Sequence, residues 1–358
     1  MRLALSTGGG DAPGLNAVIR AAVLSACARG WTVLGIKHGY AGLLGDDEIV
    51  PLTPASVRGI GHLGGTILGA ASRGNPFAYP RRRPDGGVEL IDRSEELIAR
   101  VRELSIDAIV SIGGDGSLTL AQRLFERGLN IVGVPKTIDN DVGGTITFGF
   151  DTAVSTAIEA IDKLHTTAES HDRVIVMEVM GRQAGFIALH AGFGGTADVI
   201  LIPEIPYGID KVCAKIAERD RAGRHFSIVV AAEGAYPVGG SPSTIGAPPP
   251  GQPERLGGVA DRLAHEIQSR TGKECRSLVL GHLQRGGAPT GFDRILATRF
   301  GGAAVRAVDE RRWGEMVALP GQGLATIPIA EALRAPKRVD LADDIVRTAR
   351  ETGISFGD

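Results

Sequence analysis

Short apolar runs alternate with longer amphipathic stretches along the chain. Runs of four to six apolar residues suit buried strands, whereas the longer stretches repeat apolar positions with the period of a helix. The expected strand and helix pairs are 2–6 with 15–29, 108–112 with 117–128, 131–134 with 152–166, 174–179 with 184–190, 199–202 with 210–219, and 227–231 with 259–269. This rhythm predicts an α/β fold with mostly parallel sheets. Because it recurs in the second half, we expect two Rossmann-like lobes, with the active site in the cleft between them.

Two segments lack the alternating pattern. Residues 234–258 are rich in Gly and Pro, and residues 76–87 contain the run Arg81-Arg82-Arg83. Both predict exposed loops without regular structure, and the arginine run is interpreted as a solvated face.

Composition and charge narrow the class of function. With 358 residues, of which 43% are hydrophobic, the chain has enough apolar residues for a large core, so a disordered chain is excluded. A formal net charge of -2 provides no field that would attract nucleic acid or a membrane surface. The three cysteines form no CxxC pair, and neither a targeting segment nor a membrane-length apolar run is present. We therefore expect a cytoplasmic protein that binds neither nucleic acid nor membrane.

Glycine is unusually frequent, at 51 residues, and it gathers after apolar runs. Three groups are expected at strand ends: residues 7–14, residues 113–117, and Gly286-Gly287. Glycine lets backbone amides and helix N-termini approach a phosphate, so the groups predict phosphate cradles, although any one would serve as a tight turn. Neither a Walker pattern nor a GxGxxG fingerprint is present. Asp115 in the second group would repel a bare phosphate, so it indicates bridging Mg²⁺, or alternatively a helix N-cap.

A pair of aspartates follows the expected strand at 131–134. Asp139 and Asp141 lie two residues apart, and in an extended segment they would face the same side. Such a pair suits a general base beside a carboxylate that binds metal or orients a group. The alternative interpretation is an Asx-turn loop.

At this point the chain resembles the phosphofructokinase family. The strings GGGDAPGLN, GGDGS, PKTIDND, EVMGR, AEG and GHLQRGG occur in this order, and the likeness extends from residue 1 to about residue 319. PKTIDND and GHLQRGG are highly specific, whereas lipid kinases and NAD kinases carry a turn similar to GGDG. The resemblance implies a phosphoryl-donor lobe of residues 1–149 and about 284–334, and a sugar-phosphate lobe of residues 150–283 and about 335–352.

The resemblance also implies roles for individual residues. Asp139 would be the general base for the 1-hydroxyl of fructose 6-phosphate, supported by Thr137 and Asp141, and Arg182 would stabilise the transferring phosphoryl group. The implied donor site, with Mg²⁺ near Asp115, consists of Gly10, Arg73, Asp115, Gly116 and Ser117. The segment at 69–73, which contains Arg73, is one residue longer than is usual in the family.

The implied sugar-phosphate site consists of Met180, Gly181, Arg182, Glu233, His282 and Arg285, together with Thr137, Asp139 and Asp141. Arg173 and Arg276 match arginines that reach the neighbouring subunit's site, which implies a homo-oligomer, either a dimer or a tetramer. Taken singly, His282 and Met180 would also suit a core position, and Glu233 would suit any ion pair.

Two positions bear on the phosphoryl donor. Pyrophosphate users in this family usually carry aspartate at the position of Gly116 and lysine at that of Lys136, and usual ATP users have glycine at both. Gly116 leaves room for the α-phosphate of a nucleotide, so ATP is expected as donor, with pyrophosphate as the alternative. This combination resembles the mixed-type enzymes of actinobacteria.

Two further functions stay open at this point: a kinase for a different ketose phosphate, such as sedoheptulose 7-phosphate, and a non-catalytic sensor of sugar phosphates or nucleotides. Regulation is expected to be weak. Arg20 matches a family effector position, but Leu24 and His165 stand where the family has arginines.

Overall fold

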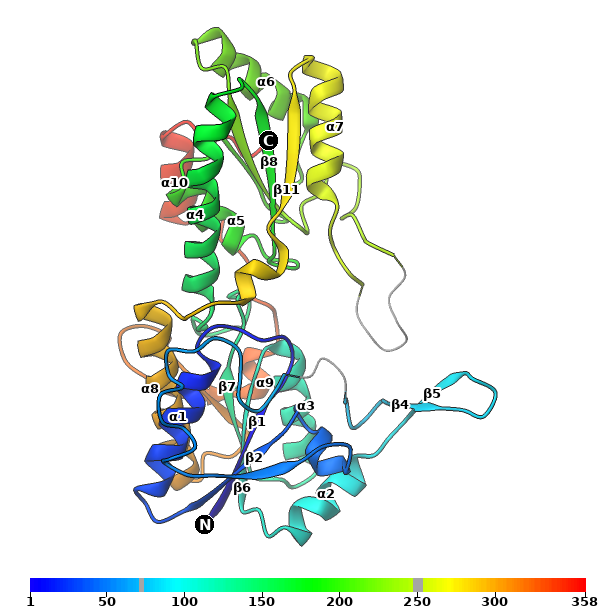
Figure 1. Ribbon diagram of the computed structural model, residues 1–358, viewed down its shortest axis with the longest axis vertical. Coiled ribbons are helices and arrows are strands. Elements are labelled where there is room, and N and C mark those ends of the chain that lie inside the picture. Colours follow the sequence, from blue (N-terminus) through cyan, green and yellow to red (C-terminus); the bar gives the residue numbers. More distant parts are fainter. Residues whose placement is uncertain (71–73, 247–253) are drawn as a thin grey trace. The chain divides into compact units, whose positions relative to one another are not determined.

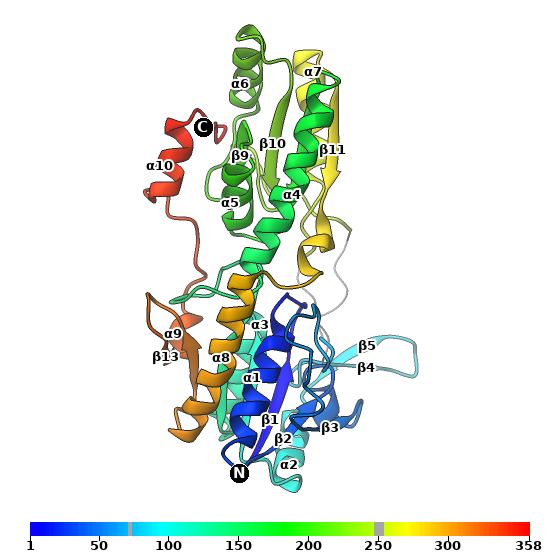
Figure 2. The same ribbon diagram turned by 60° about the vertical axis from the view of Figure 1, so that its left-hand side comes forward.

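The computed structural model describes residues 1–70, 74–246 and 254–358, and the chain divides into two compact units. The first unit contains residues 1–151 and 285–337, and the second contains residues 152–284 and 338–358. Each is an α/β unit built around its own sheet, as Figures 1 and 2 show. Within the part of the chain that is described, no helix is both long and apolar enough to cross a membrane.

The first unit has a seven-stranded sheet in the order β13-β12-β7-β6-β1-β2-β3. The five inner strands run parallel, whereas β3 and β13 pair antiparallel at the two edges. The strands are β1 (Arg2–Thr7), β2 (Thr32–Ile36), β3 (Ile49–Leu52), β6 (Ala108–Gly113), β7 (Ile131–Pro135), β12 (Glu315–Ala318) and β13 (Ala325–Pro328). The chain leaves β1 for β2 on one side, and β6 lies on the other. The order of the strands therefore switches between β1 and β6, which is where open α/β sheets bind their ligands.

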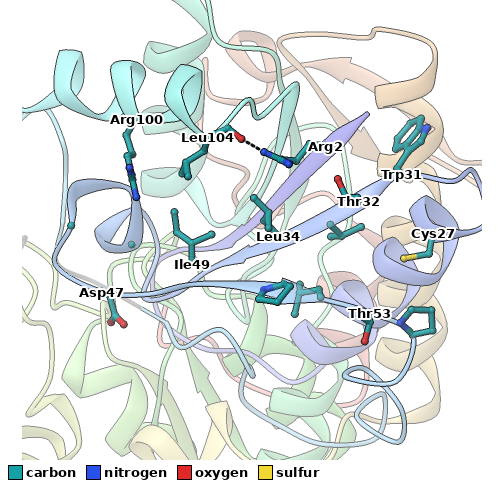
Figure 3. A pocket seen from close by; sticks show the side chains of 16 residues that line it. Arg2, Cys27, Trp31, Thr32, Leu34, Asp47, Ile49, Thr53, Arg100 and Leu104 are labelled. Atoms are coloured by element: carbon teal, nitrogen blue, oxygen red, sulfur yellow. Dashed lines mark hydrogen bonds between the residues drawn. The ribbon is translucent and has the colours of Figure 1, made fainter.

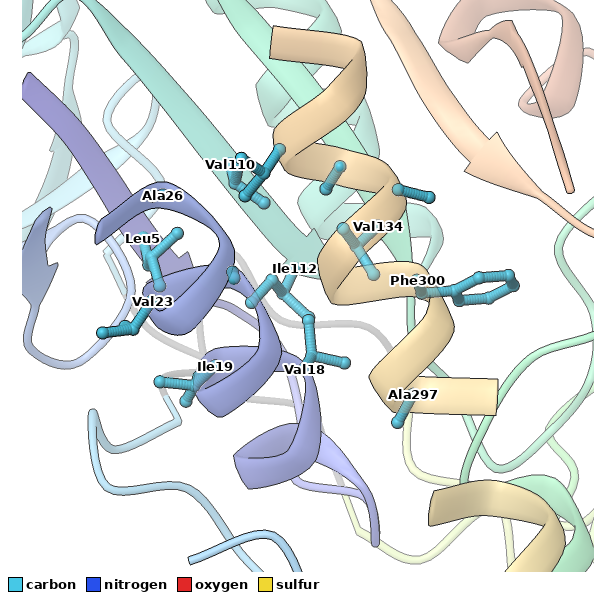
Figure 4. Close-up of a cluster of buried hydrophobic side chains, with 14 of the residues drawn as sticks. Leu5, Val18, Ile19, Val23, Ala26, Val110, Ile112, Val134, Ala297 and Phe300 are labelled. Atoms are coloured by element: carbon cyan, nitrogen blue, oxygen red, sulfur yellow. The ribbon is translucent and has the colours of Figure 1, made fainter. Parts of the chain in front are cut away.

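Helices cover both faces of this sheet. On one face α1 (Leu15–Cys27) and α8 (Gly291–Asp309) lie side by side, and their apolar side chains pack with strand residues such as Val110 and Val134 (Figures 2 and 4). Gly301 permits this contact, since an added Cβ would lie 2.4 Å from the carbonyl oxygen of Val18. The other face carries the one-turn η1 (Ala41–Leu44), α2 (Ser94–Glu103), α3 (Asp115–Glu126) and α9 (Ile329–Ala332). Because α1 and α3 pack on opposite faces of the sheet, the switch point between their N-termini is where this class of fold is expected to bind a ligand.

The second unit has a four-stranded, fully parallel sheet in the order β11-β8-β10-β9. The strands are β8 (Val174–Val179), β9 (Val199–Leu201), β10 (Ser227–Ala232) and β11 (Cys275–Val279). The other elements are α4 (Phe150–Glu169), which begins in the first unit, α5 (Phe186–Gly194), α6 (Ile209–Arg221), α7 (Val259–Thr271), the 3₁₀ helix η2 (Gly281–Arg285) and α10 (Asp344–Glu351). Val174, Val176 and Val229 form the core beneath α6 and α7. The predicted α/β class is therefore confirmed.

One expected loop is instead a hairpin. The prediction of irregular structure for residues 76–87 is wrong, because β4 (Tyr79–Arg82) pairs antiparallel with β5 (Val88–Ile91). Arg81 faces Glu89 across the hairpin and forms an ion pair with it. The hairpin is hard to predict because its strands have only four residues each and its turn is polar. The arginine run also removes the alternation of apolar and polar residues that usually marks a strand.

Candidate active site

Three loops of the first unit meet where β1, β6 and β7 end. The register places Thr7 beside Ile112, and Gly113 beside Pro135, so that the loops following these neighbouring strands emerge together. Two glycines make the approach possible. A Cβ at Gly8 would lie 2.5 Å from Oγ of Ser117, and one at Gly113 would lie 2.2 Å from Cβ of the same serine. The first two predicted glycine groups therefore form one continuous surface around the start of α3.

The N-terminus of α3 fits an anionic ligand. Its N-cap residue is Gly114, so no N-cap side chain satisfies the first backbone amides. The interpretation of Asp115 as N-cap is therefore wrong, because Asp115 is the first helical residue. Gly116 has nothing within 4 Å of the position that a Cβ would occupy. The second helical position thus opens onto free space, as the selector argument for a nucleotide requires.

Lys136 directly follows β7 and is only 3% exposed. Its ammonium donates a hydrogen bond to the carbonyl oxygen of Gly10, and a Cβ at Gly9 would lie 3.5 Å from its Nζ. Burial lowers the pKa of Lys136 to about 8, and the charge of Arg285 contributes to this lowering. The negative charges of the Asp139, Asp11 and Asp115 carboxylates oppose this lowering of the pKa. A buried cation therefore lies at the centre of the three loops.

Asp139 is also buried, at 3% exposed, and Thr137 holds it. The hydroxyl of Thr137 donates to Oδ2 of Asp139 at 3.2 Å and accepts from the Asp139 amide at 3.0 Å. Thr137 is fixed in turn, because the hydroxyl of Thr147 donates to its carbonyl oxygen at 2.8 Å. The threonine thus orients the carboxylate that the sequence identifies as the candidate base.

The segment carrying the two aspartates is not extended, which corrects the geometric argument made from the sequence. Asn140 has a φ of 55°, in the left-handed region, so the alternation of side chains along a strand does not apply. Asp141 makes a backbone contact that Asp139 does not share, because its carbonyl oxygen accepts a hydrogen bond from the amide of Lys337 at 2.8 Å. Burial lowers the pKa of the Lys337 ammonium, and the nearby Asp141 carboxylate opposes this shift.

The third glycine group differs from its expected place. Gly286 and Gly287 follow the 3₁₀ helix η2 and not a strand, because β11 ends at Val279. Gly287 nevertheless packs against Gly64, and the neighbouring Arg285 packs against Gly10, within the first unit. A Cβ at Gly64 would lie 2.2 Å from the carbonyl oxygen of Gly287, and one at Gly10 would lie 2.8 Å from Nη1 of Arg285. Arg285 also donates to the carbonyl oxygen of Asp11 at 3.1 Å, so this predicted sugar-phosphate residue lies at the first glycine loop.

The acidic side chains here suit a metal that arrives with a ligand. Among the described residues, no group of three or more His, Cys, Asp or Glu side chains could hold a metal ion. Mg²⁺ in phosphoryl-transfer sites usually takes one or two protein carboxylates and completes its shell with phosphate oxygens and water. Asp115, at the start of α3 and within the electrostatic reach of Lys136, fits that mode of binding.

In the second unit, the turn after β8 is hydrogen-bonded to, and closely packed against, the residues that follow β10. The backbone amide of Arg182 donates to a carboxylate oxygen of Glu233 at 2.9 Å, and a Cβ at Gly234 would lie 2.1 Å from the carbonyl oxygen of Arg182. Gly181 and Arg182 have φ values of 144° and 53°. A left-handed arginine is uncommon and persists where its surroundings over-determine it. The structure thus brings Gly181, Arg182 and Glu233 together, with the half-buried Met180 immediately before them.

His282 and the two remaining arginines lie at different ends of the second sheet. His282 is exposed in η2, just after β11, so the core interpretation of this histidine is wrong. Arg173 and Arg276 both contact Glu274, with Nε of Arg173 at 2.9 Å from Oε2. Arg173 precedes β8 and Arg276 lies near the start of β11, at the end opposite Arg182. A six-residue strand spans about 20 Å, so these arginines lie at the amino-terminal ends of the strands and Arg182 lies at the opposite, carboxyl-terminal ends.

Three anchoring side chains escape the sequence reasoning. Glu178 is buried and accepts from the amides of Gly258 and Ala260, at 3.3 and 3.1 Å, where it caps the start of α7. Asn16 accepts from the amide of Ile67 at 2.8 Å. Glu204 accepts from the amide of Gly185 with both oxygens, each at 3.1 Å. A polar residue at the end or in the middle of an apolar run is the only signal for Glu178 and Asn16.

Arg73, the remaining predicted donor-site residue, lies outside the described residues. A separate cavity of about 720 Å³ is formed at the edge strand β3, where Trp31, Leu34, Ile49, Arg2 and Arg100 are among its lining residues (Figure 3). None of the predicted site residues that the structure describes lines this cavity.

The fold and its loops define an α/β protein whose glycine-rich loops follow the strands at the switch point of the first sheet, the place where such folds bind their ligands. The family model described as Phosphofructokinase matches residues 2–308. An ATP-dependent 6-phosphofructokinase of Chloroflexus aurantiacus is 50% identical over 358 residues, which cover 100% of this chain and 98% of the relative. The chain therefore belongs to the phosphofructokinase family.

Two other comparisons bear on donor and fold. A pyrophosphate--fructose 6-phosphate 1-phosphotransferase of Amycolatopsis mediterranei is 48% identical over 365 residues, covering 100% of both chains. The solved phosphofructokinase of Saccharomyces cerevisiae superposes with a TM-score of 0.77 and 31% identity. That comparison covers 98% of this chain and 47% of the yeast chain, so this chain spans about half the yeast chain's length. The predicted family and fold are confirmed.

Proposed function

We propose that this chain is an ATP-dependent 6-phosphofructokinase, which transfers the γ-phosphoryl group of ATP to the 1-hydroxyl of fructose 6-phosphate. The observation that carries the proposal is the buried pair Thr137 and Asp139, beside the buried cation Lys136 and the open start of α3. The name of the relative from Chloroflexus aurantiacus supports the same activity, and the name of the relative from Amycolatopsis mediterranei supports the same sugar-phosphate substrate.

Asp139 is the proposed general base. As the sugar 1-hydroxyl oxygen forms its bond to the γ-phosphorus, the bond from phosphorus to the β,γ-bridging oxygen breaks. ADP leaves with that electron pair, and the hydroxyl proton passes to the Asp139 carboxylate. Thr137 orients the carboxylate through the hydrogen bond of 3.2 Å. Arg182, whose turn is fixed by Glu233, supplies positive charge to the transferring group.

The donor is proposed to bind at the glycine loops of the first unit. Backbone amides at the start of α3 and around Gly10 would face its phosphates, and Ser117 lies between the two loops. Mg²⁺ would be held by Asp115 together with phosphate oxygens, and when bound it neutralises the charge of the donor. Arg73, Gly116 and Ser117 keep their predicted donor-site roles as part of this proposal.

The sugar phosphate is proposed to use Met180, Gly181, Arg182, Glu233, His282 and Arg285. Arg173 and Arg276 are proposed to serve the site of a neighbouring subunit. Their place at the opposite ends of the strands from Arg182 supports this assignment, because an arginine side chain is far shorter than the roughly 20 Å between the two ends of a six-residue strand. The functional assembly would then be a homo-oligomer.

Pyrophosphate is the second candidate donor, favoured by Lys136 and by the name of the relative from Amycolatopsis mediterranei. The test measures initial rates with ATP and with pyrophosphate over a panel of sugar phosphates that includes sedoheptulose 7-phosphate. We expect fructose 6-phosphate with ATP to give the highest kcat/KM, and Asp139→Asn to abolish that rate. Turnover with pyrophosphate alone would refute the proposed donor, and a higher kcat/KM for another ketose phosphate would refute the proposed substrate.

A further inference from the structure

The turn that carries Arg182 is held by a carboxylate at each end. Glu233 binds the amide of Arg182 at its beginning, and Glu204 binds the amide of Gly185 at its end. Glu204 and Gly185 are in close contact, since a Cβ at Gly185 would lie 2.7 Å from Oε2 of Glu204. Gly185 is also the N-cap residue of α5, and a negative charge at a helix N-terminus is stabilised by the helix dipole.

Glu204 has a second partner far away in the sequence. Its Oε1 accepts from the amide of Val339 at 3.0 Å, and Val339 is 6% exposed. Hydrogen bonds to an ionised carboxylate are stronger than those between neutral groups. One side chain thus joins the Arg182 turn to residue 339, within the second unit.

Val339 lies two residues after Lys337, which is bonded to the loop that carries the aspartate pair. The chain passes from the first unit to the second between Lys337 and Arg338. On the first side, the amide of Lys337 donates to the carbonyl oxygen of Asp141 at 2.8 Å, and its Nζ donates to that of Thr145 at 3.3 Å. The first end of this crossing segment, residues 337–339, is therefore bonded to the loop that carries Asp139, and its other end is linked through the side chain of Glu204 to the turn that carries Arg182, each within its own unit.

We propose that Glu204 is a positioning residue for the phosphoryl transfer, which fixes the left-handed turn of Arg182 and ties that turn to the crossing segment. The proposal rests on the function proposed above for Arg182. Arg182 has a φ of 53°, and an arginine keeps this left-handed backbone conformation only where neighbouring groups hold it. Glu204, through its three hydrogen bonds, is one of those groups. Loss of Glu204 lets the guanidinium drift, and a misplacement of about 1 Å costs on the order of 100-fold in rate.

The test compares Glu204→Ala and Glu204→Gln with a matched control, Asp198→Asn. Asp198 is likewise a carboxylate that accepts from a main-chain amide, that of Ile228 at 2.9 Å, but it lies immediately before β9, away from the Arg182 turn. We expect kcat to fall roughly 10- to 100-fold in Glu204→Ala while KM for ATP changes less than about twofold. Glu204→Gln, which keeps one acceptor oxygen, should recover part of kcat, and Asp198→Asn should keep kcat even if its Tm falls.

Hydrogen exchange gives a readout that does not depend on activity. Peptides covering residues 181–186 and 338–340 should exchange faster in Glu204→Ala than in wild type, and Asp198→Asn should leave them unchanged. An unchanged kcat in Glu204→Ala, or an equal loss of kcat in Asp198→Asn, overturns the proposal, as does unchanged exchange in both peptides. If wild type transfers no phosphoryl group while Glu204→Ala still loosens both peptides, the proposed function fails and the anchoring role of Glu204 stands.

Discussion

The ammonium of Lys136 donates a hydrogen bond to the main-chain carbonyl oxygen of Gly10, joining the loop after β7 to the first glycine loop. The contact places a buried cation on the backbone proposed to cradle the donor's phosphates. It also leaves the lysine with a pKa of about 8, because burial outweighs the attraction of the three aspartates. Lys136 therefore titrates within the working range of an enzyme assay.

The first prediction concerns the pH dependence of catalysis. The proposed role of Lys136 needs its charged form, so kcat/KM for ATP should fall about tenfold per pH unit above about 8, the pKa of the free enzyme. Lys136→Met should lack this limb of the pH profile, the fall in kcat/KM above about pH 8, and should be at least about tenfold slower at pH 7. The exposed Lys163, paired with Glu159, supplies the control, since Lys163→Met should keep the limb. A limb that persists in Lys136→Met would assign the titration to another group.

The second prediction concerns stability. The pKa of Lys136 is 10.5 as the reference value and about 8 in the folded state, so between these values the unfolded state binds more protons. The free energy of unfolding should therefore rise with pH from about 8 to about 10.5, by up to about 3 kcal/mol from this group. Denaturant unfolding of wild type and Lys136→Met at several pH values provides the test. The variant should be the more stable at pH 7, and its advantage should shrink toward pH 10.5.

Six strand and helix pairs could be predicted from the sequence because buried strands and amphipathic helices leave periodic signals, whereas β2, β11, β12 and α8 are not predicted. Strand β8 begins and ends where expected, at Val174 and Val179. Shorter or more polar elements, such as the β4 and β5 hairpin, leave weak signals and are missed. The candidate residues at the strand ends could be named from motifs. Contacts that depend on backbone conformation could not, as the left-handed Asn140 and the anchoring role of Glu204 illustrate.

The third prediction concerns the donor selector. Gly116→Asp places a carboxylate in open space in the first turn of α3, where a negative charge is compatible with the helix dipole, so the variant should fold normally. Repulsion of the α-phosphate should lower kcat/KM for ATP by roughly 100-fold, equivalent to about 3 kcal/mol. Gly116→Asn has a similar size without the charge and should lose less. Undiminished ATP turnover in Gly116→Asp would show that the selector lies elsewhere.

The fourth prediction separates the two aspartates. Asp139 is buried and oriented by Thr137, whereas Asp141 is bonded to the crossing segment through Lys337. Asp139→Asn should lower kcat by about 10²- to 10⁴-fold, the range typical of general base catalysis, with little change in KM for ATP. Asp141→Asn should lower kcat less, because its contact with the Lys337 amide uses a backbone oxygen that remains. Equal losses in single-turnover experiments on both variants would contradict this division.

The last prediction tests whether Arg173 and Arg276 act across subunits. Both contact Glu274 at the amino-terminal ends of β8 and β11, about 20 Å along the sheet from the Arg182 turn. Arg276→Ala and Asp139→Asn should each be nearly inactive alone. If Arg276 serves a neighbouring site, mixing and reassembling the two variants creates sites that draw Asp139 from one chain and Arg276 from the other, so that activity returns to about a quarter of wild type. Arg270→Ala provides the control, since Arg270 is paired with Asp210 on the surface and should be active alone. No recovery in reassembled mixtures, with light scattering confirming the oligomer, would mean that Arg276 acts within its own chain.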